Sequence, residues 1–351
     1  MTTLTDAPAA TAAQTVRLVR RRVSRRHRLV LAAVILLWLL LFGARTLLGD
    51  FTITIPDFFR ILFGADIPPA TFILMQSKLP AAVVGTLAGL AFGSSGAVFQ
   101  TMLRNPLASP DVIGVTLGSS AAAVFSSVIL GWGSAGMSIA ALVGGLVVAA
   151  AVQFFSGEHG SATGRMILVG IGIAAALQAV IQWVLLKANI YQAQDAMVWL
   201  TGSLNAMPWS GAVRLGITVA ILLPLTCAIS RSLQALEMGD DTAQALGVRA
   251  SRSRLTLMGV VVLMTAVATS VCGPIAFIGL LSGPIARRLN GGRPSILLAA
   301  AVGACIVVGG DYLASYGIPG TPLPVGVVTG LAGAPVLLVL LIGSRRIVKD
   351  G

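Results

Sequence analysis

The chain has 351 residues, of which 56% are hydrophobic and only 10% are charged, and its formal net charge is +12. Soluble domains carry roughly 25% charged residues, so this chain has too few charges to cover a water-facing surface. The composition excludes a disordered chain, a collagen, a coiled coil and a disulfide-stapled secreted domain. With a mean hydropathy of +0.92, it predicts an all-α polytopic membrane protein.

Uncharged stretches locate the expected membrane spans, because a helix needs about 20 apolar residues to cross the hydrocarbon core. The chain contains about ten such stretches, most of them bounded by charged residues. Two long uncharged stretches are each divided in two, one at the Gly-rich residues 131–134 and the other at Gly273-Pro274. We therefore expect about ten transmembrane helices. The expected divisions are a basic tail at residues 1–28, a membrane domain at 29–345 with a polar loop at 231–254, and a short tail at 346–351.

The Lys and Arg residues predict the orientation. With the N-terminus in the cytoplasm, nineteen of the 24 fall on the cytoplasmic side. That bias agrees with the positive-inside rule and predicts that both termini are cytoplasmic. Juxtamembrane basic segments are attracted to anionic lipid, so the net charge requires no nucleic-acid partner.

Few residues in the expected spans could do chemistry. Asp311 is the one acid well inside a span, and we interpret it as a helix-end cap or a paired structural acid rather than a coupling site. Both histidines lie in segments expected to be cytoplasmic, which leaves no metal or Ser–His site at membrane depth. No Lys follows a Gly, so the phosphate loop of ATPases is absent. A transporter built this way would take its energy from a partner; an ion-coupled secondary transporter is the alternative.

Two patterns concern helix packing. Gly85, Gly89, Gly93 and Gly96 place small residues along one helix, which predicts close approach to neighbouring helices. Residues 99–108 align without gaps on residues 277–286, and the predicted topology gives the two copies opposite directions. This pattern predicts an inverted repeat with broken helices. The expected helix-break residues are Asn105, Pro106, Gly273, Pro274 and Pro284.

A polar stretch at residues 230–254 contains a candidate two-turn helix. Asp240 or Asp241 suits its N-cap, and Gly247 suits its C-terminal stop. A helix this short is unstable alone. It is therefore either a solvated loop helix or a helix that docks on another protein.

Four motifs resemble the permeases of bacterial iron–siderophore and vitamin B12 importers of the ATP-binding-cassette class, the FecCD type. They are residues 77–81, residues 96–100 with 104–114, residues 273–280, and residues 323–329 with 333–335. Within that family, residues 236–248 and 253–255 are most similar to ferric enterobactin permease subunits. Two departures are Gly283-Pro284, where the family has Pro-His, and Ala81, where the family has a second Arg.

The resemblance implies the type II ABC importer permease fold and a non-catalytic subunit without metal or cofactor of its own. ATP and Mg²⁺ would bind to partner ATPase subunits. A paralogous permease subunit would complete a heterodimer, with a homodimer possible, and an extracytoplasmic binding protein would deliver a ferric siderophore. A catecholate siderophore is favoured; another iron chelate, heme or a corrinoid is the alternative. The implied location is the bacterial cytoplasmic membrane.

The resemblance also implies three functional sites. The ATPase-coupling segment comprises Glu237, Gly239, Asp240, Asp241, Ala243, Leu246 and Gly247. The cytoplasmic gate comprises Ala162, Thr163 and Gly164. The binding protein would dock at Lys78, which aligns with a family docking position, and at Arg60 in the outer loop before it.

Overall fold

The computed structural model describes residues 9–157, 162–237, 240–245, 247 and 250–349, and all regular structure in these ranges is helical. A π-helical segment, η1 (Leu74–Lys78), leads into α4, and η2 (Pro110–Ile113) is a 3-10 turn. The α-helices are α1 (Ala9–Leu47), α2 (Ile55–Leu62), α3 (Ala70–Ile73), α4 (Leu79–Met102), α5 (Val115–Val128), α6 (Ser134–Ser156), α7 (Ala162–Lys187), α8 (Ile190–Thr201), α9 (Trp209–Glu237), α10 (Asp240–Ala245), α11 (Ala250–Cys272), α12 (Ile278–Leu289), α13 (Ile296–Tyr316) and α14 (Val325–Lys349).

Seven helices of the described chain are long and apolar enough to cross a membrane. They comprise α1, α4 with the segment before it, α6, α7, α9, α11 and α13, while α5 and the first part of α14 are shorter apolar helices. The twelve-residue α12 completes the bundle. These ten helices confirm the expected all-α membrane fold. The sequence did not predict the short helices α2, α3 and α8, or that α1 continues without a break across residue 28.

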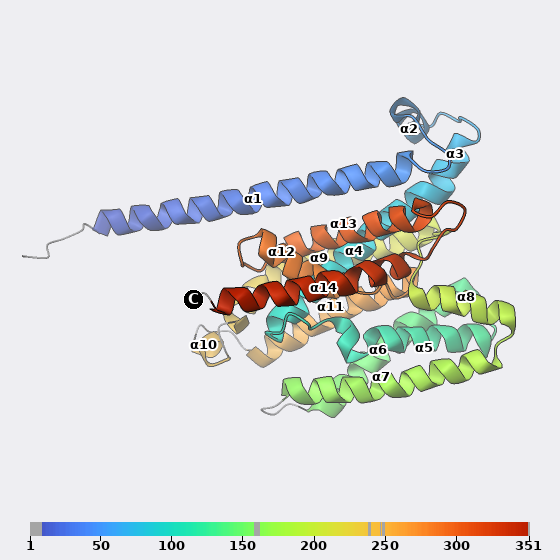
Figure 1. The fold of residues 1–351 in the computed structure, drawn as a ribbon. Helices are drawn as coiled ribbons and strands as arrows, with labels where there is room; N and C mark the ends of the chain where they lie inside the picture. The colour runs from blue at the N-terminus through green and yellow to red at the C-terminus, as the bar shows by residue number, and fades with distance from the viewer. Residues whose placement is uncertain (1–8, 158–161, 238–239, 246, 248–249, 350–351) are drawn as a thin grey trace, which may run out of the picture.

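The bundle has two ends (Figure 1), and the sequence places most of the arginines at one of them. We call one the basic end: it holds α10, the C-terminal part of α14, and the helix termini and turns that carry Arg104, Arg165, Arg252, Arg287 and Arg293. The opposite end, which we call the α8 end, also holds α2 and α3. The segments that the sequence assigned to two sides of the membrane therefore lie at two ends of the bundle.

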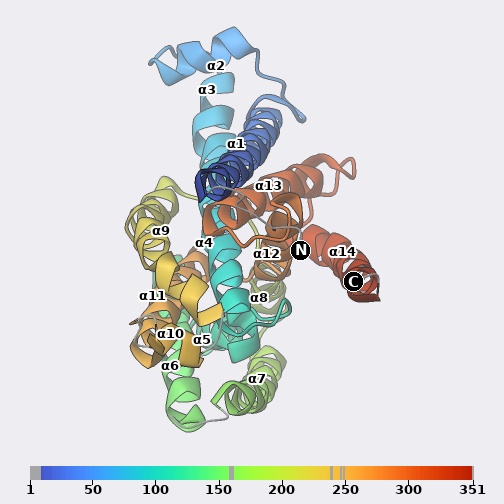
Figure 2. The same cartoon turned by 90° about the vertical axis from the view of Figure 1, so that its left-hand side faces the viewer.

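Helix α4 is the central helix, with other helices around it on several sides (Figure 2). The small residues that it was expected to use for packing explain this position. A Cβ at Gly89 would lie 2.5 Å from Cα of Ala304 in α13, and a Cβ at Gly93 would lie 2.5 Å from the carbonyl oxygen of Ala299. A Cβ at Gly96 would overlap the backbone of Gly279 in α12. The glycines therefore let the backbones of α4, α12 and α13 approach closely, as predicted.

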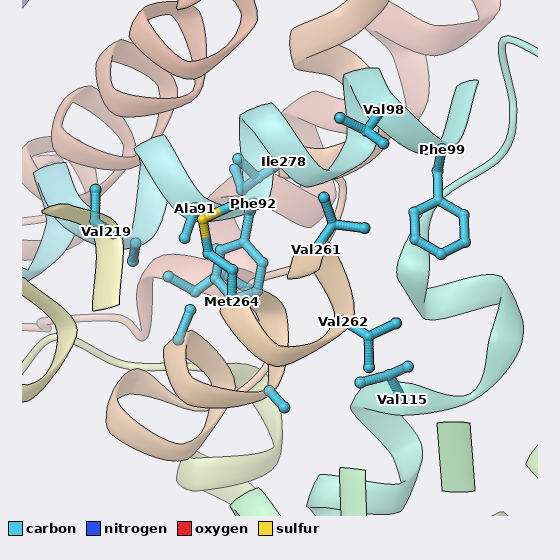
Figure 3. Close-up of a cluster of buried hydrophobic side chains, with 14 of the residues drawn as sticks. Ala91, Phe92, Val98, Phe99, Val115, Val219, Val261, Val262, Met264 and Ile278 are labelled. Carbon is cyan, nitrogen blue, oxygen red and sulfur yellow. The ribbon is translucent and has the colours of Figure 1, made fainter. Parts of the chain in front are cut away.

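Larger side chains fill the remaining space around α4. Phe92, Val98 and Phe99 on α4 belong to one buried apolar cluster with Val261 and Met264 on α11 (Figure 3). Because lipid tails are as apolar as these side chains, the packing itself, rather than removal from water, holds membrane helices together. The cluster fixes the position of α4 against α11.

The second half of the chain repeats the helix order of the first half. A long helix, a break and a short helix, followed by two long helices, occur as α4–α5–α6–α7 and again as α11–α12–α13–α14. Helix α4 runs toward the basic end and α11 runs away from it (Figure 1), which is the expected inverted repeat. The register expected from the sequence is wrong: Pro106 follows α4 as Pro274 follows α11, whereas Pro284 lies inside α12.

Candidate translocation and coupling sites

The expected short helix at the basic end is present as α10. It packs against α9 and α11, with the Ala243 side chain fully buried and with Thr242 and Gln244 exposed. The N–H of Gly247 donates to the carbonyl oxygen of Gln244 (2.9 Å), and Gly247 has a φ of +80°. This left-handed conformation is the predicted glycine stop. Helix α10 thus has one anchored face and one open face.

For the other residues expected to form the coupling segment, the structure describes at most the backbone. Glu237 is the last residue of α9, and Asp240 and Asp241 are the first two residues of α10. Gly239 and Leu246 lie outside the described residues. The two acids therefore occupy the helix N-terminus, where negative charge is favourable.

The three expected gate residues form the first turn of α7, also at the basic end. Gly164 is exposed, and no heavy atom lies within 4 Å of the position that a Cβ would take there. Helix α7 packs on α5 and α6 but leaves Leu168 and Leu186 71% and 84% exposed. The gate segment thus begins a helix whose outer face is uncovered in the single chain.

The break after α4 is organised by Asn105. Its backbone N–H donates to the carbonyl oxygen of Gln100 (3.1 Å), and its side-chain oxygen accepts the N–H of Leu107 (2.9 Å). Arg104 adopts a φ of +49°, and Pro106 lies in the exposed turn that follows. The side chain of Asn105 thereby replaces backbone hydrogen bonds that the helix lacks. Asn105 and Pro106 thus lie in the turn that follows the end of α4.

Gly273-Pro274 directly follows the end of α11, and the backbones of three helices meet there. Gly273 has a φ of +71°, and a Cβ there would lie 2.5 Å from the carbonyl oxygen of Trp199 in α8. The N–H of Ser203 donates to the carbonyl oxygen of Cys272 (3.0 Å). The N–H of Gly326 at the start of α14 donates to the carbonyl oxygen of Gly202 (3.1 Å). The ends of α8 and α11 and the start of α14 therefore meet at this break.

The expectation that Pro284 breaks a helix is wrong, because Gln100 compensates for it. Proline has no N–H, so the carbonyl oxygen of Leu280 lacks its usual helical donor. Nε2 of Gln100 donates to that oxygen (3.1 Å) and to the carbonyl oxygen of Gly279 (3.0 Å). A Cβ at Gly283 would overlap the Gln100 amide, so glycine is needed for this approach. Helix α12 continues to Leu289 past the proline.

Sequence reasoning did not single out Gln100. The available signal was indirect: a proline inside a buried helix requires an external donor for the carbonyl group four residues earlier. Gln100 lies in a motif that was recognised only as part of the family resemblance. Its function as a donor to α12 requires the positions of both helices.

The two expected docking residues at the α8 end differ in accessibility. Arg60 on α2 is exposed, with a guanidinium nitrogen 3.7 Å from an Asp57 carboxylate oxygen. Lys78 is only 3% exposed, and its Nζ donates to the carbonyl oxygens of Leu48 (2.7 Å) and Phe51 (2.6 Å). The expectation that Lys78 presents a free outer charge is therefore wrong. Its ammonium group ties the loop after α1 to the start of α4.

A cavity of about 600 Å³ lies at the basic end between α4, α12 and α14. Gln100, Asn105, Pro106 and Pro284 all line it, so three of the five predicted helix-break residues meet there. Among the residues that the structure describes, no group of three His, Cys, Asp or Glu side chains could hold a metal ion.

The chain also matches a known protein family over most of its length. The FecCD transport family matches residues 18–343 of the chain. The chain belongs to the FecCD transport family. It is 38% identical over 299 residues to the ferric enterobactin transport system permease protein FepG of Escherichia coli K12, with 85% of this chain and 91% of FepG covered.

A second relative is FepD, another ferric enterobactin transport system permease protein of the same strain. This FecCD-family chain is 34% identical to FepD over 285 residues, which cover 80% of the chain and 84% of FepD. A solved inward-facing structure assigned to the metal-chelate type of ABC transporter superimposes with a TM-score of 0.80. That match covers 89% of this chain and 98% of the other at 23% sequence identity, so it shows a shared fold.

Proposed function

We propose that this FecCD-family protein is the transmembrane permease subunit of an ATP-driven importer of ferric siderophores in the bacterial cytoplasmic membrane. The observation that carries the proposal is α10, a short helix at the basic end with Ala243 buried against α9 and α11. A body that pushes on the exposed face of α10 moves two spanning helices. The chain needs no ATP site of its own, because separate ATPase subunits would bind ATP and Mg²⁺ and act on α10.

The proposed orientation places the basic end in the cytoplasm together with both termini. Positive charge is retained on the cytoplasmic side of membrane proteins, and the basic end is where ATPase subunits must dock. The α8 end then faces outward and receives the extracytoplasmic binding protein. Exposed Arg60 is the proposed contact there, while buried Lys78 supports the loop that carries α2.

A second permease subunit completes the proposed pathway. The outer face of α7 is uncovered, and so is that of α14, where Leu331 is 73% exposed. Two such faces from each of two subunits would surround a central path, with Ala162, Thr163 and Gly164 at its cytoplasmic constriction. The similarity to both FepG and FepD favours a paralogous partner, so we propose a heterodimer.

Catecholate siderophores are the proposed cargo, because FepG and FepD are both ferric enterobactin transport system permease proteins. The direct test is competition: uptake of a radiolabelled ferric catecholate is measured against excess ferric citrate, ferric hydroxamate, heme or corrinoid. Only other catecholates should compete. Competition by another chelate class alone would assign the cargo to that class and leave the importer mechanism intact.

Coupling through α10 is tested by pull-down of the ATPase subunits. Asp241→Lys places a positive charge at a positive helix end, and Gly247→Pro disturbs the left-handed stop. Both variants should insert normally and recover less ATPase. Asp195→Lys in α8 makes the same charge reversal at the opposite end of the bundle and is the control. Normal ATPase recovery from both α10 variants would contradict the coupling role.

The proposed gate is tested by thiol labelling. A cysteine replacing Thr163 should react with membrane-permeant reagents at a rate that depends on nucleotide, and Thr163→Trp should block uptake. Leu186→Cys, at the other end of α7, is the control for general accessibility. Reactivity at position 163 that ignores nucleotide, with full uptake by Thr163→Trp, would place the constriction elsewhere.

A further inference from the structure

Helix α7 carries two exposed amide side chains inside an apolar span. They belong to Gln178 and Gln182, and the span that contains them runs from Gly164 to Lys187. Within the seven described spans, Gln178 is the one exposed amide or charged side chain that lies two or more turns from either end. It therefore lies near the middle of the membrane, where polar side chains are rare.

An amide that faces hydrocarbon is costly, because lipid tails replace none of the hydrogen bonds that the amide makes with water. Polar side chains in membrane helices therefore face another helix or a water-filled cavity. The helices that α7 packs on in this chain, α5 and α6, leave both amides exposed. Gln178 and Gln182 thus mark a part of α7 that lipid should not cover in the assembled transporter.

The helical repeat places these amides in line with the proposed gate. An α-helix has about 3.6 residues per turn, so 18 residues make about five turns. Gly164 and Gln182 are 18 residues apart and therefore lie on the same side of α7. The two are about 27 Å apart along the helix axis. Gln178, about one turn before Gln182, lies on nearly the same line.

The exposed face of α7, a peripheral helix of the bundle (Figure 2), has two edges of different chemistry. One edge carries Gly164, Gln178 and Gln182. Each residue turns the helix by about 100°, which places Val180 and Trp183 on the other edge, where they are 41% and 52% exposed. The apolar edge suits lipid or an apolar partner surface. The amide edge suits a path that holds water and cargo.

We propose that Gln178 and Gln182 form a polar subsite on the wall of the central path, which donates hydrogen bonds to oxygen atoms of the ferric siderophore as it passes. This subsite rests on the proposed importer function and names the part of α7 that touches the cargo. An amide NH₂ group donates two hydrogen bonds and carries no net charge. Neutral donors suit passage, because a pathway must bind its cargo weakly enough to release it.

Thiol labelling tests which edge of α7 faces the path and does not depend on the cargo. In proteoliposomes of the complete transporter, Gln178→Cys and Gln182→Cys are treated with a charged, membrane-impermeant thiol reagent, with and without nucleotide. The unsubstituted transporter is the blank for the three native cysteines. In the nucleotide state that reacts faster, both positions should be labelled about tenfold faster than Val180→Cys and Trp183→Cys, because the reactive thiolate requires water.

Uptake tests contact with the cargo. Gln178→Leu with Gln182→Leu removes both donors, and each lost hydrogen bond is worth about a fivefold change. The double variant should therefore slow ATP-dependent uptake of a radiolabelled ferric tris-catecholate by roughly twenty-fivefold. It should still recover the partner permease and ATPase subunits in full.

Two matched variants complete the uptake test. Gln178→Asn with Gln182→Asn keeps both amides and should retain most of the uptake rate. Gln153→Leu removes a half-buried amide from α6 and should leave uptake unchanged. The pair separates the loss of an amide on the amide edge of α7 from the loss of an amide elsewhere in the membrane.

Three results would overturn the subsite. Equal labelling at the four cysteine positions would mean that the amides do not mark the path. Loss of the partner permease subunit from the double leucine variant would mean that the amides bind the partner's helix rather than the cargo. Unchanged uptake by that variant would mean that the cargo passes without touching them. A wild-type transporter without ATP-dependent uptake would instead contradict the importer function, while the labelling rates would still show which edge faces water.

Discussion

Arg45 in α1 and Asp311 in α13 form a buried ion pair, with 2.5 Å between Nε of Arg45 and a carboxylate oxygen of Asp311. The side chains are only 5% and 3% exposed, and the residues are 266 positions apart in the sequence. The hydroxyl of Tyr316 accepts a further hydrogen bond from the same guanidinium (3.4 Å). Of the two roles that the sequence allowed for Asp311, helix-end cap and paired structural acid, the structure shows the second. A role in ion coupling would require breaking this pair.

Removing one partner of this pair should destabilise the protein strongly. Asp311→Leu or Arg45→Met alone leaves a buried charge uncompensated, which costs about 3–5 kcal/mol. The double variant Arg45→Met with Asp311→Leu removes both charges and should unfold at nearly the temperature of the wild-type protein. Thermal unfolding in detergent measures this. If the double variant is as unstable as the less stable single variant, then Arg45 or Asp311 also stabilises the protein through an interaction outside this ion pair.

Gln100 should stabilise the protein because it donates the hydrogen bond that Pro284, which has no N–H, cannot donate. Gln100→Leu removes the donor to two carbonyl groups on α12, that of Gly279, which is buried, and that of Leu280, which is part-buried. The loss should cost about 1–3 kcal/mol of unfolding free energy. Pro284→Ala restores a helical N–H to the carbonyl group of Leu280, so it should recover part of that loss in the Gln100→Leu background. A double-mutant cycle by thermal unfolding measures the coupling. Strictly additive effects would contradict this assignment.

The close approach of α4 and α13 predicts a sharp difference between two glycines. Gly89→Ala places a methyl group against the backbone of α13 and should cost about 1–3 kcal/mol through overpacking. Gly172→Ala in α7 meets no atom within 4 Å and should be neutral or stabilising by up to about 1 kcal/mol. Unfolding midpoints of the two purified variants test this. If Gly89→Ala leaves the unfolding midpoint unchanged, then α4 and α13 can move apart at little cost.

Arg60 and Lys78 should have different functions at the α8 end. Arg60 should affect the association of the binding protein, and Lys78 should affect the stability of the permease. Arg60→Glu reverses an exposed charge and should slow association of the binding protein at low salt more than at high salt. The individual contact is weak, about 0–1 kcal/mol. Lys78→Met should lower the unfolding midpoint but leave the salt dependence of association unchanged. An unchanged low-salt rate in Arg60→Glu would assign docking to apolar contacts or to the partner subunit.

Sequence patterns predicted features that depend on neighbouring residues in one helix. The ten segments follow from spacing of charges, and the stop at Gly247 and the breaks at Asn105 and Gly273 follow from local backbone chemistry. Asp311 was interpreted as a helix-end cap or a paired structural acid, because ionisable groups are rare and costly inside a membrane.

Features that join distant helices were missed or misjudged. The sequence placed Pro284 at a break because the amide that rescues its helix belongs to Gln100, 180 positions before Leu280. It placed Lys78 at the surface because the carbonyl groups of Leu48 and Phe51 reach it only after the loop folds back. It did not show the arginine-lined cavity, whose residues come from four separate stretches of chain.

We propose that the energy for transport comes from ATP bound by a partner subunit. The most direct measurement is uptake of a radiolabelled ferric catecholate into proteoliposomes that contain the permease, its partner subunits and the binding protein, with ATP either inside or absent. We predict uptake that requires ATP, is blocked by vanadate, is lost in Asp241→Lys, and persists when ionophores remove all ion gradients. Uptake that continues without ATP and stops when a proton or sodium gradient is removed would contradict it.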